Sequence, residues 1–174
     1  MIQLRSGVVV IAALGLGACG QASVGPPPAV SAPMEQISAA SIPDFRAQAG
    51  MTYADFTAQP AMQRYALEGL GVAGTAEAQR FNHAMANQVP GLVAGGGGAQ
   101  ALVFSGCAPS GCLEGLSVVA IDIGTGDVFV GVSDMAGAEK LVPNDRLEAL
   151  LRLTSPSQSW DDPIRTTAVA AAGP

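Results

Sequence analysis

The sequence is poor in the side chains on which most active sites depend. Its 174 residues include one histidine, three cysteines and one tryptophan. The lone histidine, His83, lies beside Phe81 and Met85 on an expected helix, where a histidine is more often a packed or surface residue than a catalytic base. Ser110 has no base near it in the sequence, and no Gly-x-Ser-x-Gly motif occurs. These shortages favour a protein that is not an enzyme, and no cofactor is expected.

Phosphate-binding and nucleic-acid-binding patterns are also missing from the central part of the chain. The run 95–98 consists of glycines alone, without the lysine and hydroxyl residue of a phosphate loop, and is typical of a flexible link. The chain has 8 basic and 14 acidic residues and no basic stripe, which disfavours a nucleic-acid partner. Loss of Arg5 with a leader would leave a net charge of −7. A cationic protein partner fits this charge better, although an acidic balance also serves solubility.

The three cysteines fall into one single residue and one pair. Cys107 and Cys112 are separated by four residues, which is not the Cys-x-x-Cys spacing of redox enzymes, and no histidine or third cysteine lies nearby to complete a metal site. They lie between two expected antiparallel strands, where their Cα atoms can approach the distance that a disulfide prefers. We therefore expect a disulfide, and Cys19 needs a separate explanation.

The first 18 residues have the layout of an export signal. A short region with one positive charge, Arg5, precedes an apolar stretch over residues 7–16 that is too short to span a bilayer. The tetrad Leu-Gly-Ala-Cys that ends at Cys19 resembles the bacterial lipoprotein signal, in which the cysteine becomes the lipidated N-terminus. An ordinary cleaved signal with an unmodified cysteine is the alternative. Gly20 follows instead of aspartate, which favours an outer-membrane anchor facing the periplasm.

The remainder divides into a tether, one domain and a tail. Residues 19–42 are rich in Ala, Ser and Pro and predict an extended tether. Residues 43–153 are long enough for one domain with a core, and they contain no repeat. Residues 154–174 are polar and then Ala-rich, which predicts a disordered tail in which Trp160 is the one side chain that could dock on the domain.

The domain is expected to be helical first and then built of strands. Thr52 can cap a turn that includes Phe56, Pro60 can begin a second, and Thr75 can cap a helix that ends before Pro90. Three runs rich in β-branched and aromatic residues predict a meander of strands at 101–105, 116–123 and 128–132. Both faces of these strands are apolar, so helices should cover both sides. Asp145 and Glu148 are spaced as a capping pair for a last short helix. The fold class is therefore α+β.

The disulfide would close a protruding loop between the first two strands. Such a short closure should stabilise the fold by only about 2 kcal/mol. Its larger effect is on the loop, because the disulfide and Pro109 together leave the tip few conformations and lower the entropy lost when the tip enters a partner's cleft. A strap that merely ends a hairpin is an equally good interpretation of the chemistry alone.

Five segments of the sequence resemble, in order and spacing, the Ivy family of periplasmic inhibitors of vertebrate lysozyme. They are Phe81–Met85, Val89–Val93, Phe104–Cys112, Leu116–Ile123 and Gly126–Gly131. The resemblance covers residues 75–153. It implies a five-stranded antiparallel sheet flanked by helices, from which the loop Ala108, Pro109, Ser110 and Gly111 protrudes to enter the active-site cleft of a lysozyme.

The loop also departs from the family pattern. Ser110 stands where the family has the histidine that hydrogen-bonds the catalytic carboxylates, and Gly111 stands where it has aspartate. A serine offers one donor and no charge, so its interaction with a carboxylate pair should be weaker. Two functions stay open: inhibition of a muramidase or lytic transglycosylase by the loop, or a non-inhibitory envelope module with the same fold. A homodimer is compatible with either.

Overall fold

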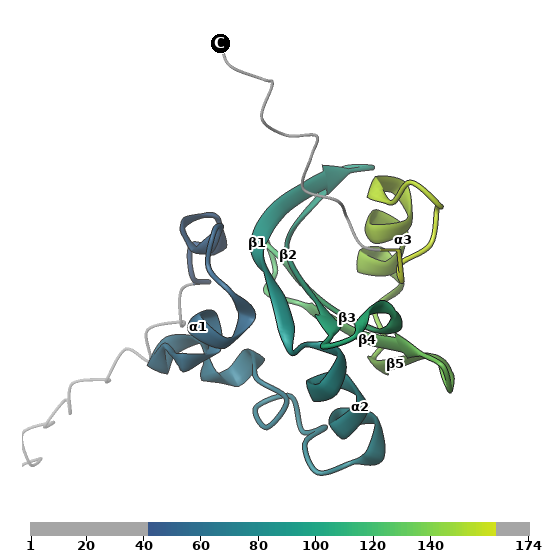
Figure 1. Cartoon of the computed structure of the whole chain (residues 1–174). Helices are drawn as coiled ribbons and strands as arrows, with labels where there is room; N and C mark the ends of the chain where they lie inside the picture. Colours follow the sequence, from purple (N-terminus) through teal and green to yellow (C-terminus); the bar gives the residue numbers. More distant parts are fainter. Residues whose placement is uncertain (1–41, 163–174) are drawn as a thin grey trace, which may run out of the picture. The chain divides into compact units, whose positions relative to one another are not determined.

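The structure, a computed structural model, describes residues 42–162, and five antiparallel strands form its central sheet (Figure 1). The predicted leader, Cys19, nearly all of the predicted tether and residues 163–174 lie outside the described residues. The strands follow one another across the sheet in the order β1-β2-β3-β4-β5. The elements are η1 (Phe45–Gln48), α1 (Tyr53–Ala58), η2 (Pro60–Tyr65), α2 (Ala76–Ala84), β1 (Asn87–Gly96), β2 (Ala99–Ala108), β3 (Gly111–Asp122), β4 (Val128–Asp134), β5 (Gly137–Val142) and α3 (Asp145–Thr154).

The helices begin where hydroxyl side chains and proline favour them. Thr52 accepts a hydrogen bond from the Asp55 backbone N–H at the start of α1, and Thr75 accepts one from Ala78 at the start of α2. Pro60 is the first residue of η2, where its missing N–H costs nothing. These three predicted starts are confirmed, and η2 is a 3-10 helix.

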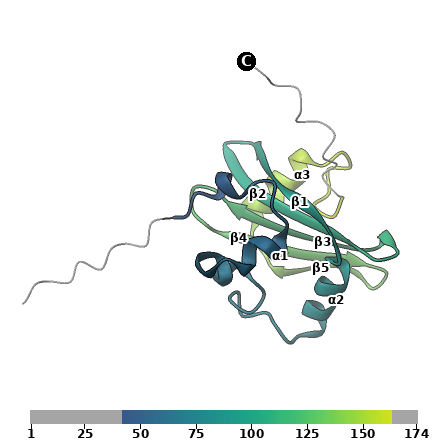
Figure 2. The same ribbon diagram turned by 60° about the vertical axis from the view of Figure 1, so that its left-hand side comes forward.

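Two cores lie on the two faces of the sheet, with α1 and α2 on one side and α3 on the other (Figures 1 and 2). On the first side, the rings of Phe56 and Phe104 pack with their centroids 5.0 Å apart. Alternate residues of β2, β3 and β4 serve opposite cores, as Val130 and Phe129 do in β4. The predicted α+β meander with helices on both faces is confirmed.

The start of α3 differs from the prediction. Asn144, not Asp145, is its N-cap and accepts a hydrogen bond from the Leu147 N–H. Glu148 is therefore one position too far along the helix to complete a capping box. Its carboxylate instead accepts hydrogen bonds from Lys140 of β5 and Arg152 of α3, and these bonds hold the pKa of Glu148 below its ordinary value. The glutamate thus joins the last strand to the last helix.

The domain continues past residue 153, where the sequence analysis placed its end. Trp160 is only 5% exposed and packs edge-to-face on Phe129, with the ring centroids 5.4 Å apart. Gly131 of β4 makes room for the indole, because any Cβ there would lie 2.4 Å from a ring atom. Trp160 therefore belongs to the core on the α3 side.

Two of the five strands were not expected from the strand-forming runs, although the family resemblance implied five. β1 carries Pro90 and Gly91 at a register shift, and β5 has no buried residue. Gly97 and Gly98, predicted to lie in a flexible link, form the tight turn between β1 and β2 at positive φ. No helix among residues 42–162 is long and apolar enough to cross a membrane.

Candidate functional site at the sheet tip

The predicted loop is the turn of the β2–β3 hairpin. Ala108 pairs with Gly111 as the last pair of the ladder, which leaves Pro109 and Ser110 as the turn. The next pair joins Cys107 to Leu116, so residues 112–115 of β3 have no partner in β2 and form a large bulge. The functional loop is therefore longer than the sequence suggested, because it includes the bulge.

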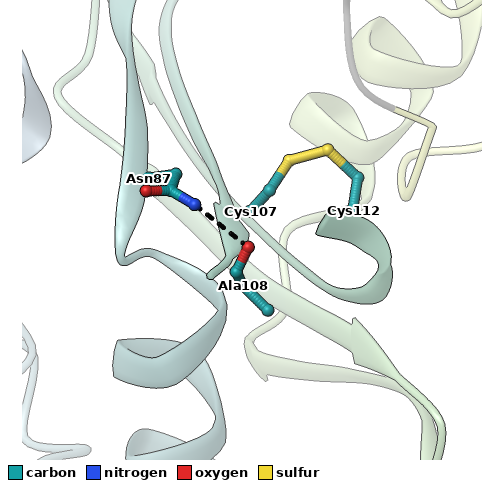
Figure 3. Close-up of a disulfide and its surroundings, with 4 residues drawn as sticks. All are labelled: Asn87, Cys107, Ala108 and Cys112. Atoms are coloured by element: carbon teal, nitrogen blue, oxygen red, sulfur yellow. Dashed lines mark hydrogen bonds between the residues drawn. A yellow bond between two sulfur atoms is a disulfide. The ribbon is translucent and has the colours of Figure 1, made fainter. Parts of the chain in front are cut away.

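A disulfide between Cys107 and Cys112 closes the base of this bulge, with the two Cα atoms 4.5 Å apart (Figure 3). The Asn87 side chain at the start of β1 donates a hydrogen bond of 3.2 Å to the Ala108 carbonyl. The bond ties β1 to the residue next to the turn. Both constraints reduce the number of conformations that the turn can adopt.

The four predicted loop residues differ in their exposure. Pro109 and Ser110 are exposed, Gly111 is half-buried, and Ala108 is fully buried. Ala108 cannot contact a partner, because its methyl group faces the backbone of the bulge at Gly115. The expectation that all four residues protrude is therefore wrong for Ala108, which is part of the support beneath the turn.

Gly111 has a backbone reason to be glycine. Its φ is +125°, in a region that other residues rarely adopt. A residue with a side chain, such as aspartate, would strain this backbone. The glycine at residue 111 therefore goes with the local conformation of this turn and its bulge.

Leu113 and Glu114 of the bulge are exposed functional candidates that the sequence analysis missed. Leu113 is 96% exposed, and Glu114 accepts a hydrogen bond from the Ser110 hydroxyl. In the described part of the chain, Glu114 has no basic partner. The signal for the bulge was the interruption of the apolar alternation by Glu114 and Gly115 just before Leu116.

A second hairpin turn lies at the same end of the sheet. In a meander, the β2–β3 and β4–β5 turns must share one end of the sheet (Figure 2). At that end β3 pairs with β4, with Gly115 opposite Asp134. The β4–β5 turn consists of Met135 and Ala136, and Met135 is 86% exposed. Among the exposed residues of the two turns and the bulge, we call five the sheet tip: Pro109, Ser110, Leu113, Glu114 and Met135.

Arg80 of α2 fixes the second turn. Its guanidinium donates to both carboxylate oxygens of Asp134, at 2.6 and 2.7 Å, and to the carbonyl of Gly137 at 2.7 Å. A further bond of 3.0 Å reaches Glu139. The hydrogen bonds from Arg80 hold the pKa of Asp134 below its ordinary value. The bidentate ion pair therefore restricts the conformation of the β4–β5 turn, as the disulfide restricts that of the β2–β3 turn.

Other residues singled out in the sequence do not form a site. His83 is exposed on α2. Asp122, beside the β3–β4 turn, is buried, and its carboxylate accepts hydrogen bonds from the backbone N–H groups of Gly124 and Thr125. Asp127 is exposed. No group of three or more potential metal ligands occurs in residues 42–162.

Comparisons with known proteins add nothing to this description: no family model, curated protein or solved structure matches the chain.

Proposed function

We propose that this protein is an envelope lipoprotein that binds a lysozyme-type muramidase, or a related lytic transglycosylase, by inserting the Cys107–Cys112 loop into the active-site cleft. The observation that carries the proposal is the exposed and rigid turn at Pro109 and Ser110. Its neighbours Cys107 and Ala108 are covalently or sterically held, so little entropy remains to be lost on binding.

The chemistry of such a cleft fits a small convex donor. Glycosidases of this kind place two carboxyl groups on either side of the bond they cleave. The Ser110 hydroxyl can donate one hydrogen bond to such a group. A loop that fills the cleft without offering a glycosidic bond would block access of the glycan and would not itself be cut as substrate.

Glu114 supports the alternative, a non-inhibitory envelope module with the same fold. The Ser110 hydroxyl already donates to the Glu114 carboxylate. Entry into the cleft would require the hydroxyl to change partner and would bring Glu114 towards two more carboxylates. Repulsion between the Glu114 carboxylate and the carboxylates of the cleft would oppose association. The loop of this chain is therefore expected to bind more weakly than one with a cation at its apex.

The anchor belongs to the same proposal. Lipidation at Cys19 would hold the domain on the periplasmic side of the envelope, with the outer membrane favoured by Gly20. Residues 20–42 would then let the domain extend away from the bilayer into the periplasm, where peptidoglycan-cleaving enzymes act.

The test is the rate at which a panel of lysozymes and lytic transglycosylases clears a peptidoglycan suspension, with and without the purified chain. We expect the chain to slow at least one enzyme, and Glu114→Gln to slow it at lower concentration because one repulsive charge is gone. Glu68→Gln, at an exposed position outside the sheet tip, is the matched control for the loss of one negative charge. If neither the chain nor Glu114→Gln slows any enzyme, the non-inhibitory alternative holds.

A further inference from the structure

Two exposed apolar side chains belong to the sheet tip. The large hydrophobic residues that are exposed in the described part of the chain are Ile42, Leu113, Met135 and Leu153. Single apolar residues on a surface need no explanation. Leu113 and Met135, however, lie on two adjacent hairpins at the same end of the sheet, and both are almost fully exposed at 96% and 86%.

Both side chains are presented by constrained backbone. Leu113 follows Cys112 directly, so the disulfide limits its position. Met135 lies between Asp134 and Gly137, which are both bonded to Arg80. Apolar groups on rigid supports lose less entropy on binding than the same groups on mobile loops, which is the property of an interface anchor.

The polar apex is a poorer anchor than its apolar neighbours. The Ser110 hydroxyl has its hydrogen bond within the loop, from Ser110 to Glu114. Exchanging that bond for one to a partner gives little net free energy, because one hydrogen bond replaces another. Burial of Leu113 removes apolar surface from water, and no contact within the domain has to be broken for it.

We infer that Leu113 and Met135 form the main contact with the enzyme and determine which enzyme is bound, while Ser110 makes only a minor contribution. The inference rests on the proposed function. The occupant of this surface is the apolar wall of the substrate cleft, next to the catalytic carboxylates. Ligand clefts are lined mainly by apolar and aromatic side chains, with few polar groups.

Chain geometry and charge favour this occupant. Leu113 is only three residues from Ser110, and Gly115 pairs with Asp134 next to Met135, so a cleft that admits the turn meets both side chains. The chain has a formal net charge of −6, which draws it towards a cationic enzyme and away from a second copy of itself.

The experiment measures the dissociation constant of the full chain, purified in mild detergent, for each enzyme of the lysozyme and transglycosylase panel. We expect Leu113→Ser to raise the dissociation constant about 10- to 100-fold, and Met135→Ser to raise it by about tenfold. Ser110→Ala should change it less than about threefold. Neither apolar side chain is packed in the fold, so the substitutions should leave thermal unfolding unchanged.

Leu153→Ser is the matched control. Leu153 is 68% exposed at the end of α3, and it lies against Gly97 in the β1–β2 turn, at the opposite end of the sheet. This variant should bind as the wild type does. If the wild type binds but Ser110→Ala abolishes binding while Leu113→Ser does not, the inference is wrong and the proposed function stands.

Two further outcomes also decide the question. If the wild type binds no enzyme of the panel, the proposed function and the inference fall together. If Leu113→Ser instead abolishes a concentration-dependent dimer seen in analytical ultracentrifugation and leaves enzyme binding intact, the apolar pair is a contact between copies and the inference is overturned.

Discussion

The substitution Gly131→Ala should displace Trp160 from its packed position on the sheet. A Cβ atom at residue 131 would lie 2.4 and 2.7 Å from two carbon atoms of the indole ring. Atoms in folded proteins do not approach so closely, and β4 is a central strand that cannot shift without disturbing its two neighbours. The indole must therefore move, and the segment that carries it must move too.

The cost can be bounded from the burial of the ring. Trp160 is 5% exposed and packs against Phe129, and truncating such a residue to alanine costs about 3–5 kcal/mol. Forcing one methyl group into a filled core costs about 1–3 kcal/mol. We expect Gly131→Ala to lower the free energy of unfolding by about 2–3 kcal/mol, with the full release of Trp160 as the upper limit.

Urea unfolding followed by circular dichroism measures this cost, and the fluorescence of the single tryptophan shows whether the ring has become solvated. Gly95→Ala is the matched control, because a Cβ there comes no closer than 3.4 Å to any atom, and that nearest atom belongs to the flexible Gln100 side chain. In a Trp160→Ala background the cost of Gly131→Ala should fall below about 0.5 kcal/mol. A cost that persists in that background would refute the contact.

Three other results are expected. Arg80→Gln should lower the free energy of unfolding by about 2 kcal/mol at neutral pH. Because the pKa of Asp134 is lowered in the folded state, the difference in stability between wild type and variant should shrink as the pH falls below about 4. Acid unfolding curves measure this difference, and a difference that grows at low pH would contradict the ion pair. Cys19→Ser should move the protein from the membrane fraction to the soluble periplasmic fraction; continued sedimentation with the envelope would exclude the lipid anchor. Joint replacement of Cys107 and Cys112 by alanine should lower stability by about 2 kcal/mol, and peptide mapping of the unreduced wild type should yield one linked peptide pair in place of two alkylated thiols.

The parts of the fold that could be predicted are those with a local cause. Thr52, Pro60 and Thr75 begin their helices through their own side chains, and the alternation of apolar residues assigns the faces of β3 and β4. The fold class follows from these elements. The disulfide follows from the spacing of its cysteines between two strands.

The parts that could not be predicted depend on contacts between distant residues. β5 has no buried residue, and it is held by pairing with β4 and by the bond from Lys140 to Glu148. The docking of Trp160 was anticipated, but its place was not, because Gly131, 29 positions earlier, is what leaves space for the ring. The local spacing also suggested a cap at Asp145, one residue too late, because asparagine and aspartate cap helices equally well and Asn144 directly precedes it.

The same distinction applies to the sheet tip. Pro109 and Ser110 could be placed in an exposed turn from the flanking cysteines. The bulge that exposes Leu113 depends on the register between β2 and β3, and its neighbour Met135 is brought close by the pairing of β3 with β4. Neither register can be read from the residues of one strand alone.

The most direct test of the central claim is a competition experiment at the active site of a muramidase that the chain binds. A soluble chito-oligosaccharide that fills the substrate cleft is titrated into the complex while binding of the chain is measured. If the loop at Pro109 and Ser110 enters the cleft, the apparent dissociation constant of the chain should rise linearly with the oligosaccharide concentration. The rise becomes large once that concentration exceeds the dissociation constant of the oligosaccharide for the enzyme. An apparent dissociation constant that stays the same when the cleft is saturated would contradict the claim.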